Sequence, residues 1–353
     1  MSCNFGEKVK ITIFGQSHSE AIGVVVDGLP AGKKIDMEKV YAFMSRRAPG
    51  KNKFSTPRQE KDKPEILSGL VDGVTCGAPL CAVIRNGDTR SKDYENLKTV
   101  PRPAHADFTA FFKHNGFNDI RGGGNFSGRM TAPLCFAGAV CMQLLEEKGI
   151  KIGAHIEKIA GVTDVRYDSV NVDFADTDKK EFPVIDDNAG EKMLKKIENA
   201  RQDGNSVGGV IECAITGLPV GMGEPMFDGM ENVISHAVFA VPAVKGIEFG
   251  RGFEVADMTG EENNDSFSVC DGKFVTDTNN HGGILGGISS SMPVIFRVAI
   301  KPTPSIGKEQ KSVNLITREE ENLVINGRHD PCIVPRAVPC IEAAAAVAIM
   351  NLI

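Results

Sequence analysis

Hydrophobic residues recur along this chain with two spacings, one typical of strands and one typical of helices. Val9, Ile11 and Ile13 alternate with polar residues across 8–14, which predicts a strand with one buried face. Similar apolar runs bounded by turn-forming or polar residues predict further strands at 21–27, 64–70, 79–85, 207–216 and 294–300. The predicted strands are therefore spread over the whole chain.

Helical periodicity marks four of the segments that separate or follow these strands. Asp36 is a predicted N-cap for the first helix, and a second helix is predicted for 131–148, starting near Pro133. A short amphipathic helix is predicted for 191–201. The last helix, from about Pro339, is apolar all round and too short to span a bilayer, so we expect it in the core.

The turn that follows the strand at 21–27 has a near copy later in the chain. Gly28-Leu29-Pro30-Ala31-Gly32 and Gly217-Leu218-Pro219-Val220-Gly221 each close an apolar strand, which hints at an internal structural repeat. Residues 167–189 are acidic and aperiodic and are predicted to form a surface excursion. Since no proline-rich or low-complexity linker divides the chain, the pattern favours one integrated domain over 1–353.

Composition narrows the function classes. A net charge of −6 and the absence of tryptophan argue against a general nucleic-acid or membrane-surface role, although local arginine clusters remain possible. Nine cysteines without C-x-x-C or zinc spacing indicate free thiols in a reducing compartment. Residues 1–16 lack the apolar core of a signal peptide, so we expect a soluble, cytoplasmic protein without nucleic-acid or membrane partners.

The stretch 102–131 carries the strongest chemical signal. Its glycines 122–124 lie between Arg121 and Arg129, and glycine runs allow backbone N–H groups to turn toward an anion. His105 can exchange a proton near neutral pH. The stretch is a candidate anion site with an acid–base residue beside it; a flexible surface loop before a helix is the alternative.

Further polar clusters follow predicted strands or helices in four places. They are GQSHS at 15–19, RRAPGKNK at 46–53, NNHGGILGGISSSMP at 279–293 and NGRHDPCIVPR at 326–336. None contains a P-loop, a dinucleotide-binding fingerprint or a G-x-S-x-G elbow, and no metal-ligand spacing is present. Their arginines, histidines and glycines together favour a site for a multiply anionic ligand, or for two ligands.

Taken in order, these segments resemble the chorismate synthase family. The resemblance extends over nearly the full chain and rests on the order and spacing of many motifs. They are FGQSH at 14–18, the Gly-Leu-Pro turn, RRAPG at 46–50, GDTRSKDY at 87–94, RPAHADF at 102–108, RGGGNFSGRMTAP at 121–133, AVKGIEFG at 243–250, GGILGGIS at 282–289, KPTPSI at 301–306, and GRHDPC with VPRAVP at 327–339.

The resemblance implies an α+β fold in which a helical core is sandwiched between two antiparallel sheets. It implies an enzyme that removes phosphate from 5-enolpyruvylshikimate 3-phosphate by an anti-1,4-elimination, giving chorismate. It also implies a homotetramer and reduced FMN as cofactor, although the reaction has no net redox change. Because the chain lacks a dinucleotide fingerprint, we expect a separate partner to reduce the flavin; intrinsic NAD(P)H-dependent reduction is the alternative.

Residue roles follow from the same resemblance. His18 matches the histidine that protonates the departing phosphate, His105 the one that protonates the reduced flavin, and Asp330 the aspartate that helps remove the C6 proton. The positions associated with substrate are Ser17, Arg47, Lys53, Arg102, Arg129 and Arg328. The positions that line the flavin are Asn125, Phe126, Ser127, Ala243, Gly286, Lys301, Pro302, Thr303, Pro304, Ser305 and Arg328.

The chain departs from the commoner family pattern in and beside the glycine loop. Asn125-Phe126 stands where Arg-Ser is usual, and Met130 stands where glutamate is usual. Gln16 and Ser19 replace glutamate and glycine around His18. Two alternative functions therefore stay open: a flavin-dependent enzyme acting on another phosphorylated acid, and a flavin-binding homologue without turnover.

Overall fold

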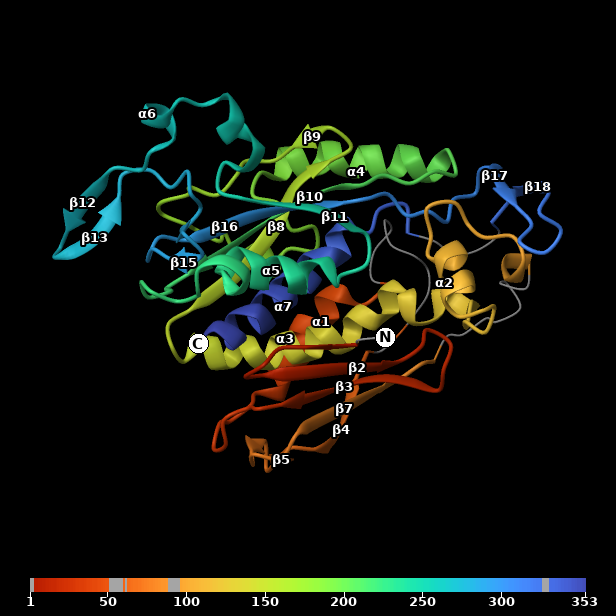
Figure 1. Ribbon diagram of the computed structural model, residues 1–353, viewed down its shortest axis with the longest axis horizontal. Coiled ribbons are helices and arrows are strands. Elements are labelled where there is room, and N and C mark those ends of the chain that lie inside the picture. The colour runs from red at the N-terminus through yellow and green to blue at the C-terminus, as the bar shows by residue number, and fades with distance from the viewer. Residues whose placement is uncertain (1–2, 51–59, 61, 88–95, 326–329) are drawn as a thin grey trace.

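Two five-stranded antiparallel sheets enclose a layer of helices (Figure 1). The structure, a computed structural model, describes residues 3–50, 60, 62–87, 96–325 and 330–353. The first sheet has the order β1 (Asn4–Phe5), β2 (Lys10–Gly15), β3 (Ala21–Asp27), β7 (Leu80–Arg85) and β4 (Pro64–Ser68). The second has the order β11 (Val244–Phe249), β16 (Val294–Ile300), β10 (Gly209–Thr216), β8 (Lys151–Ile159) and β9 (Val162–Thr163).

The enclosed layer consists of four helices. They are α1 (Met37–Arg47), α3 (Thr131–Glu146), α5 (Met230–Phe239) and α7 (Val334–Leu352). Asp36 caps α1 as predicted, accepting hydrogen bonds from the backbone N–H groups of Glu38 and Lys39. This layered α+β architecture agrees with the fold that the sequence resemblance implied.

Smaller elements lie outside the three layers. Helix α4 (Asp187–Gln202) covers the outer side of the second sheet, and the β12 (Phe267–Cys270) and β13 (Lys273–Thr276) hairpin projects from the body of the protein (Figure 1). The remaining short elements are α2 (Asp107–Lys113), α6 (Gly260–Asn263), β5 (Leu70–Val71), β6 (Val74–Thr75), β14 (Ile284–Leu285), β15 (Ile288–Ser289), β17 (Gln310–Val313) and β18 (Glu320–Leu323).

The strand and helix order confirms the internal repeat. Each half runs strand, strand, helix, strand, strand, helix: β2-β3-α1-β4-β7-α3 and β8-β10-α5-β11-β16-α7. In each sheet the second strand lies between the first and the fourth, and the third is placed outside the fourth. Gly28 and Gly217 hold matching positions, with φ of 84° and 81°. A Cβ would lie 2.0 Å from the Lys8 carbonyl oxygen in one and 2.2 Å from that of Gly149 in the other, so both turns need glycine.

Helix α7 starts earlier than the sequence pattern predicted. It begins at Val334 rather than near Pro339, because Pro335 takes a first-turn position and Pro339 is tolerated inside the helix. At 19 residues it is long and apolar enough to cross a membrane, which corrects the expectation that it is too short. Nevertheless, 89% of its 18-residue apolar window is buried inside the protein, which confirms its predicted place in the core.

Two other segments also differ from the predictions. Helix α4 begins at Asp187, capped by Asp186, four residues before the predicted start. The surface excursion predicted for 167–189 is wrong in part, since Tyr167 and Val184 are buried. The Tyr167 ring packs edge-on against the His155 ring, with their centroids 4.6 Å apart. Because His155 lies in β8, this segment folds back onto the second sheet.

Helices α3 and α7 approach each other unusually closely at Gly138. A Cβ at this position would lie 2.3 Å from the Ala343 Cβ and 2.4 Å from its Cα. These helices belong to different halves of the repeat, so their contact joins the two halves at the centre of the core.

We predict that Gly138→Ala lowers the free energy of unfolding by about 1–3 kcal/mol, because the added methyl overpacks this contact. Urea unfolding measures the change. Gly260→Ala is the matched control, since a Cβ at Gly260 meets nothing within 4 Å. Equal stabilities of the two variants would show that the helices separate without cost.

Candidate active site

A cavity of about 580 Å³ opens at one end of the helical layer. Arg47 ends α1 and Ala240 follows α5, whereas Thr131 begins α3 and Arg336 lies in the first turn of α7. The repeat thus places the C-terminal ends of two helices beside the N-terminal ends of the other two. The N-termini of α3 and α7 carry partial positive charge and the C-termini of α1 and α5 partial negative charge, so the side chains decide which charge this end favours.

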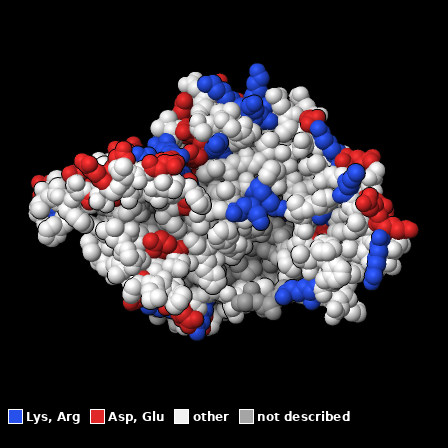
Figure 2. Space-filling view, turned by 45° about the horizontal axis from the view of Figure 1, so that its top comes forward, with Lys and Arg blue, Asp and Glu red and all other residues white. Residues whose placement is uncertain are grey.

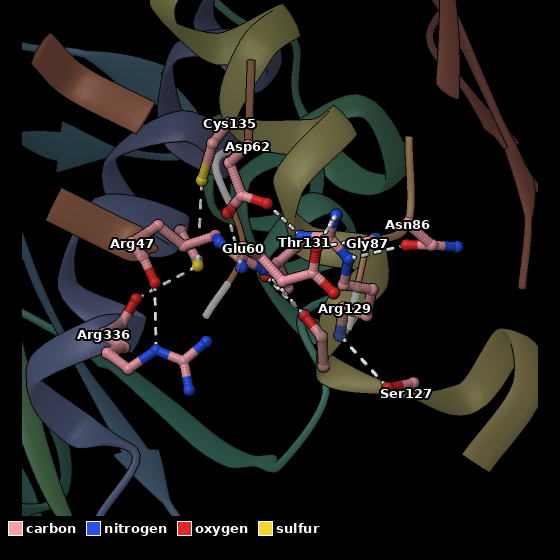
Figure 3. A network of polar contacts seen from close by, with 12 residues as sticks. Arg47, Glu60, Asp62, Asn86, Gly87, Ser127, Arg129, Thr131, Cys135 and Arg336 are labelled. Atoms are coloured by element: carbon pink, nitrogen blue, oxygen red, sulfur yellow. Dashed lines mark hydrogen bonds and ion pairs between the residues drawn. The ribbon is translucent and has the colours of Figure 1, made fainter. Parts of the chain in front are cut away.

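Two buried arginines, Arg47 and Arg129, and the half-buried Arg336 line the floor of the cavity (Figure 3). Asp62 lies between Arg47 and Arg129, accepting a hydrogen bond from Arg47 Nη2 at 2.8 Å and another from Arg129 Nη1. Glu60 Oε2 lies 3.7 Å from Arg129 Nη2. Burial would raise the pKa of Asp62, but the two guanidiniums hold it below its usual range.

Each guanidinium of this pair keeps one nitrogen for a further acceptor. Arg47 Nε and Arg129 Nη2 are buried and have no hydrogen-bond partner among the described residues. Buried donors are seldom left unpaired. An anionic ligand in the cavity would satisfy them while Asp62 holds the other side of each guanidinium.

Asp330 and Arg336 form the third ion pair of the cavity floor. Arg336 Nη1 donates to Asp330 Oδ2 at 2.5 Å, and Arg336 Nε donates to the carbonyl oxygen of Arg47 at 2.9 Å. Burial lowers the pKa of Arg336, opposed by the adjacent carboxylate of Asp330. Arg336 therefore ties the candidate base Asp330 to the end of α1.

A second polar cluster, formed by Arg102, His105 and Asp107, lies on the wall. His105 Nδ1 lies 2.6 Å from Asp107 Oδ1 and 3.2 Å from Arg102 Nη2. Arginine can only donate, so the shorter contact indicates that Nδ1–H donates to the carboxylate, which leaves Nε2 for a ligand. Burial would raise the pKa of Asp107, but hydrogen bonds from Arg102 and His105 hold it far below its usual range.

The glycine loop passes between the two candidate acid histidines. A Cβ at Gly122 would lie 2.4 Å from the His18 ring and 2.5 Å from the buried Ser17 hydroxyl oxygen. A Cβ at Gly123 would lie 3.2 Å from the His105 ring. Both glycines have positive φ, 59° and 83°, so the loop needs glycine for its conformation as well as for space. His18 itself lies behind Gly122 and does not line the cavity.

Most positions expected to line a flavin do line this cavity. They are Asn125, Phe126, Ser127, Ala243, Lys301, Thr303, Pro304 and Ser305. Thr303 Oγ1 is buried without a partner among the described residues, and Ser305 Oγ accepts from Arg102 Nη1 at 3.1 Å. Pro302 is not part of the lining.

Gly286 is not brought to the cavity. Its neighbour Gly287 packs against Gly229, which precedes α5, whereas the cavity lies beyond the C-terminal end of that helix. Ten residues of helix span about 15 Å. Lys53 and Arg328, the other expected ligands, lie outside the described residues.

Sequence reasoning missed several residues of the cavity floor and wall. Asp107 stands two positions after His105 and five after Arg102, a spacing that the motif RPAHADF already contains. Glu60 and Asp62 carried no signal, because acidic residues in a basic, turn-rich stretch are usually solvated. Among the described residues, no group of three His, Cys, Asp or Glu side chains is placed to hold a metal ion.

The charge distribution on one face is uneven. Figure 2 shows Lys and Arg side chains around and within a hollowed area near the middle of this face, with Asp and Glu gathered mainly toward its edges. A chain with a net charge of −6 therefore still offers local positive potential to an anion. A second cavity of about 710 Å³, mainly apolar, adjoins the first and shares Asn125, Thr131, Ala240 and Pro242 with it.

The comparisons with known proteins all point to one family. The chorismate synthase family profile matches residues 9–353. A chorismate synthase of Lancefieldella parvula is 46% identical, with 99% of this chain and 96% of the relative covered. One of Korarchaeum cryptofilum is 44% identical, covering 98% and 96%. A crystal structure of chorismate synthase aligns with a TM-score of 0.76 at 27% identity, covering 99% of this chain and 92% of the other.

Asp107→Asn should lower the free energy of unfolding by about 2–4 kcal/mol at pH 7, because it leaves the buried Arg102 guanidinium uncompensated. The folded-state pKa of Asp107 is depressed, so its contribution is present above the unfolded pKa of about 3.9 and is lost as pH falls through the folded pKa. Unfolding at pH 7 and pH 3 should show the gap between wild type and variant shrinking in acid. A constant gap would contradict this.

Proposed function

The chain belongs to the chorismate synthase family, and from this premise we propose that the cavity at the end of the helical layer is its active site. The enzyme is a carbon–oxygen lyase that converts 5-enolpyruvylshikimate 3-phosphate into chorismate and phosphate. The observation that carries the proposal is the glycine loop, which packs against His18 on one side and His105 on the other above a floor of buried arginines.

We assign substrate binding to the arginines and to the N-termini of α3 and α7. The substrate carries a phosphate and two carboxylates, and the unpaired nitrogens of Arg47 and Arg129 are suited to such oxygens. Ser17 is proposed to bind the same phosphate; its hydroxyl is buried behind Gly122, outside the cavity lining, and has no hydrogen-bond partner among the described residues. Lys53 and Arg328 are proposed to add positive charge.

Proton transfers are divided among three groups. His18 is proposed to donate a proton to the departing phosphate; because it lies beside Ser17, behind Gly122 and outside the cavity lining, this contact requires the glycine loop to shift. Asp330, held in position by Arg336, helps to remove the proton from C6, at the far end of the 1,4 system from the carbon that loses phosphate. His105 Nε2 protonates the second ligand, with its ring oriented by Asp107. As phosphate leaves, the buried guanidiniums stabilise the growing negative charge.

We propose reduced FMN as that second ligand. The cavity of about 580 Å³ lies within the range that small-molecule sites occupy, and Thr303 Oγ1 offers an unsatisfied polar atom in its lining. When bound, reduced FMN supplies a reductant that is recovered unchanged. The residues that would hold it are Asn125, Ser127, Ala243, Lys301, Thr303, Pro304 and Ser305.

We also propose that the enzyme is a cytoplasmic homotetramer supplied with reduced flavin by a separate protein. Exposed aromatic rings support the assembly: Phe267 and Phe274 on the projecting hairpin are 71% and 74% exposed. Burying apolar side chains of this size in a subunit interface would stabilise the assembly. The missing dinucleotide fingerprint supports a separate reductant.

Anaerobic incubation with reduced FMN and the phosphorylated substrate should release phosphate and chorismate in equal amounts. His18→Ala, His105→Ala and Asp330→Asn should each lower turnover by about 100-fold or more, because each removes a proton-transfer group. His281→Gln is the control, since His281 pairs with Asp265 and Ser290 and lines neither cavity. Loss of turnover in the control alone, or product-free incubation of the wild type, would refute the proposal.

Gly122→Ala should lower turnover by more than about tenfold, because the methyl group collides with Ser17 and His18. Gly149→Ala carries the same left-handed backbone strain, with φ of 78°, but its Cβ meets nothing within 4 Å. It should lose stability and keep turnover. If the two variants lose turnover equally, backbone strain rather than the histidine contact explains the effect.

A further inference from the structure

Two cysteines that the proposed mechanism does not use face each other at the cavity floor. Cys135 lies in α3 and Cys340 in α7, and their sulfur atoms are 3.8 Å apart. Both side chains are buried, yet Cys340 lines the cavity together with Arg47 and Arg336. Figure 3 shows Cys135 at the edge of the same polar network as Arg47 and Asp62. Cys340 is thus reachable from the cavity, whereas Cys135 lies behind it and outside the lining.

The two helix backbones are close enough for a covalent link. Three residues further along both helices, Gly138 packs so tightly on Ala343 that a Cβ would lie 2.4 Å from the Ala343 Cα. The sulfur atoms of a disulfide are about 2.05 Å apart. We infer that side-chain rotation is the main movement needed to bring these two sulfur atoms together from 3.8 Å. Cys141, one and a half turns beyond Cys135 in α3, is also buried but lines neither cavity.

The two thiols have different environments. The hydrogen bond from Cys135 and the nearby guanidiniums of Arg47 and Arg336 outweigh burial and lower the pKa of Cys340 to about 7. Burial instead raises the pKa of Cys135 well above its usual value. By contrast, burial alone raises the pKa of Cys141 to about 12. Cys340 is therefore the more acidic thiol of the pair, and Cys135 is its hydrogen-bond donor.

We propose that Cys135 and Cys340 form an oxidation site inside the cavity, in which Cys340 reacts with a peroxide and Cys135 then closes a disulfide between α3 and α7. The inference rests on the position of Cys340 in the cavity lining, on the two guanidiniums beside it and on the 3.8 Å spacing of the pair. It does not depend on which reaction the cavity catalyses.

The chemistry balances with one peroxide per pair. The Cys340 thiolate attacks a peroxide oxygen, forming an S–O bond as the O–O bond breaks, and leaves a sulfenic acid and hydroxide. Cys135 sulfur then attacks Cys340 sulfur; the S–S bond forms, the S–O bond breaks, and the departing oxygen takes the Cys135 proton as water. Two thiols and one hydrogen peroxide thus yield one disulfide and two waters.

Hydrogen peroxide treatment of the full chain, followed by thiol alkylation and peptide mass spectrometry, tests the proposal. A variant with the exposed cysteines Cys3, Cys76 and Cys270 changed to serine removes surface reactions. We expect a Cys135–Cys340 disulfide, formed at least about tenfold faster than any oxidation of Cys141. Because both rates are read within one molecule, the comparison holds even if further substitutions destabilise the chain.

Single substitutions separate the two roles. In Cys135→Ser, dimedone should trap a sulfenic acid at Cys340, whereas in Cys340→Ser no sulfenic acid should appear at Cys135. Inorganic phosphate at saturating concentration should slow the oxidation by occupying the arginines. Oxidation of Cys340 no faster than that of Cys141, or sulfenic acid at Cys135 in place of Cys340, would overturn the proposal.

Discussion

The constraint on which the proposed active site depends is the burial of two guanidiniums, with a third half-buried beside them, at one end of a helical layer. A buried, unpaired cation is strongly destabilising, so each arginine needs an acidic partner before the chain can fold around it. Asp62 serves Arg47 and Arg129, and Asp330 serves Arg336. Glu60 lies beside Arg129 as well, so three carboxylates face three arginines on the described floor. The proposed affinity for an anion therefore rests on guanidinium N–H groups without hydrogen bonds rather than on a large net charge.

The sheets and helices make this arrangement possible. Two sheets cover both faces of the helical layer, which lets α7 be apolar on nearly all sides and lets α3 approach it at Gly138. Arg47 reaches the floor because α1 ends there, and Arg336 reaches it because α7 begins there. The glycine loop then lies across the same end, so that histidines from two distant motifs meet on its two sides.

The sequence pattern predicts local structure correctly where a position strongly favours one residue type. Alternating strands, the Asp36 cap, the two Gly-Leu-Pro turns and the glycine loop were all visible, since glycine and capping residues have strong positional preferences. The sequence pattern does not identify residues whose role depends on a distant partner. Asp62 and Cys340 acquire their environments only through pairing with Arg129 and Cys135, and neither pair has a local spacing signal. The sequence pattern places the start of α7 too late, because proline usually marks the start of a helix and Pro339 instead lies inside this one.

The duplicated architecture has a consequence for how such a site can arise. Equivalent helix ends from the two halves meet at the cavity, but their residues have diverged: the first half supplies Arg47, Arg129 and the histidines, whereas the second supplies Asp330, Arg336 and the segment 301–305. Neither half alone encloses the reacting groups. A symmetric pair of identical units would present the same residues twice, so two chemically different ligands could not be held side by side. Because the two halves carry different residues at corresponding positions, one cavity combines arginines and histidines from the first half with an acid–arginine pair from the second.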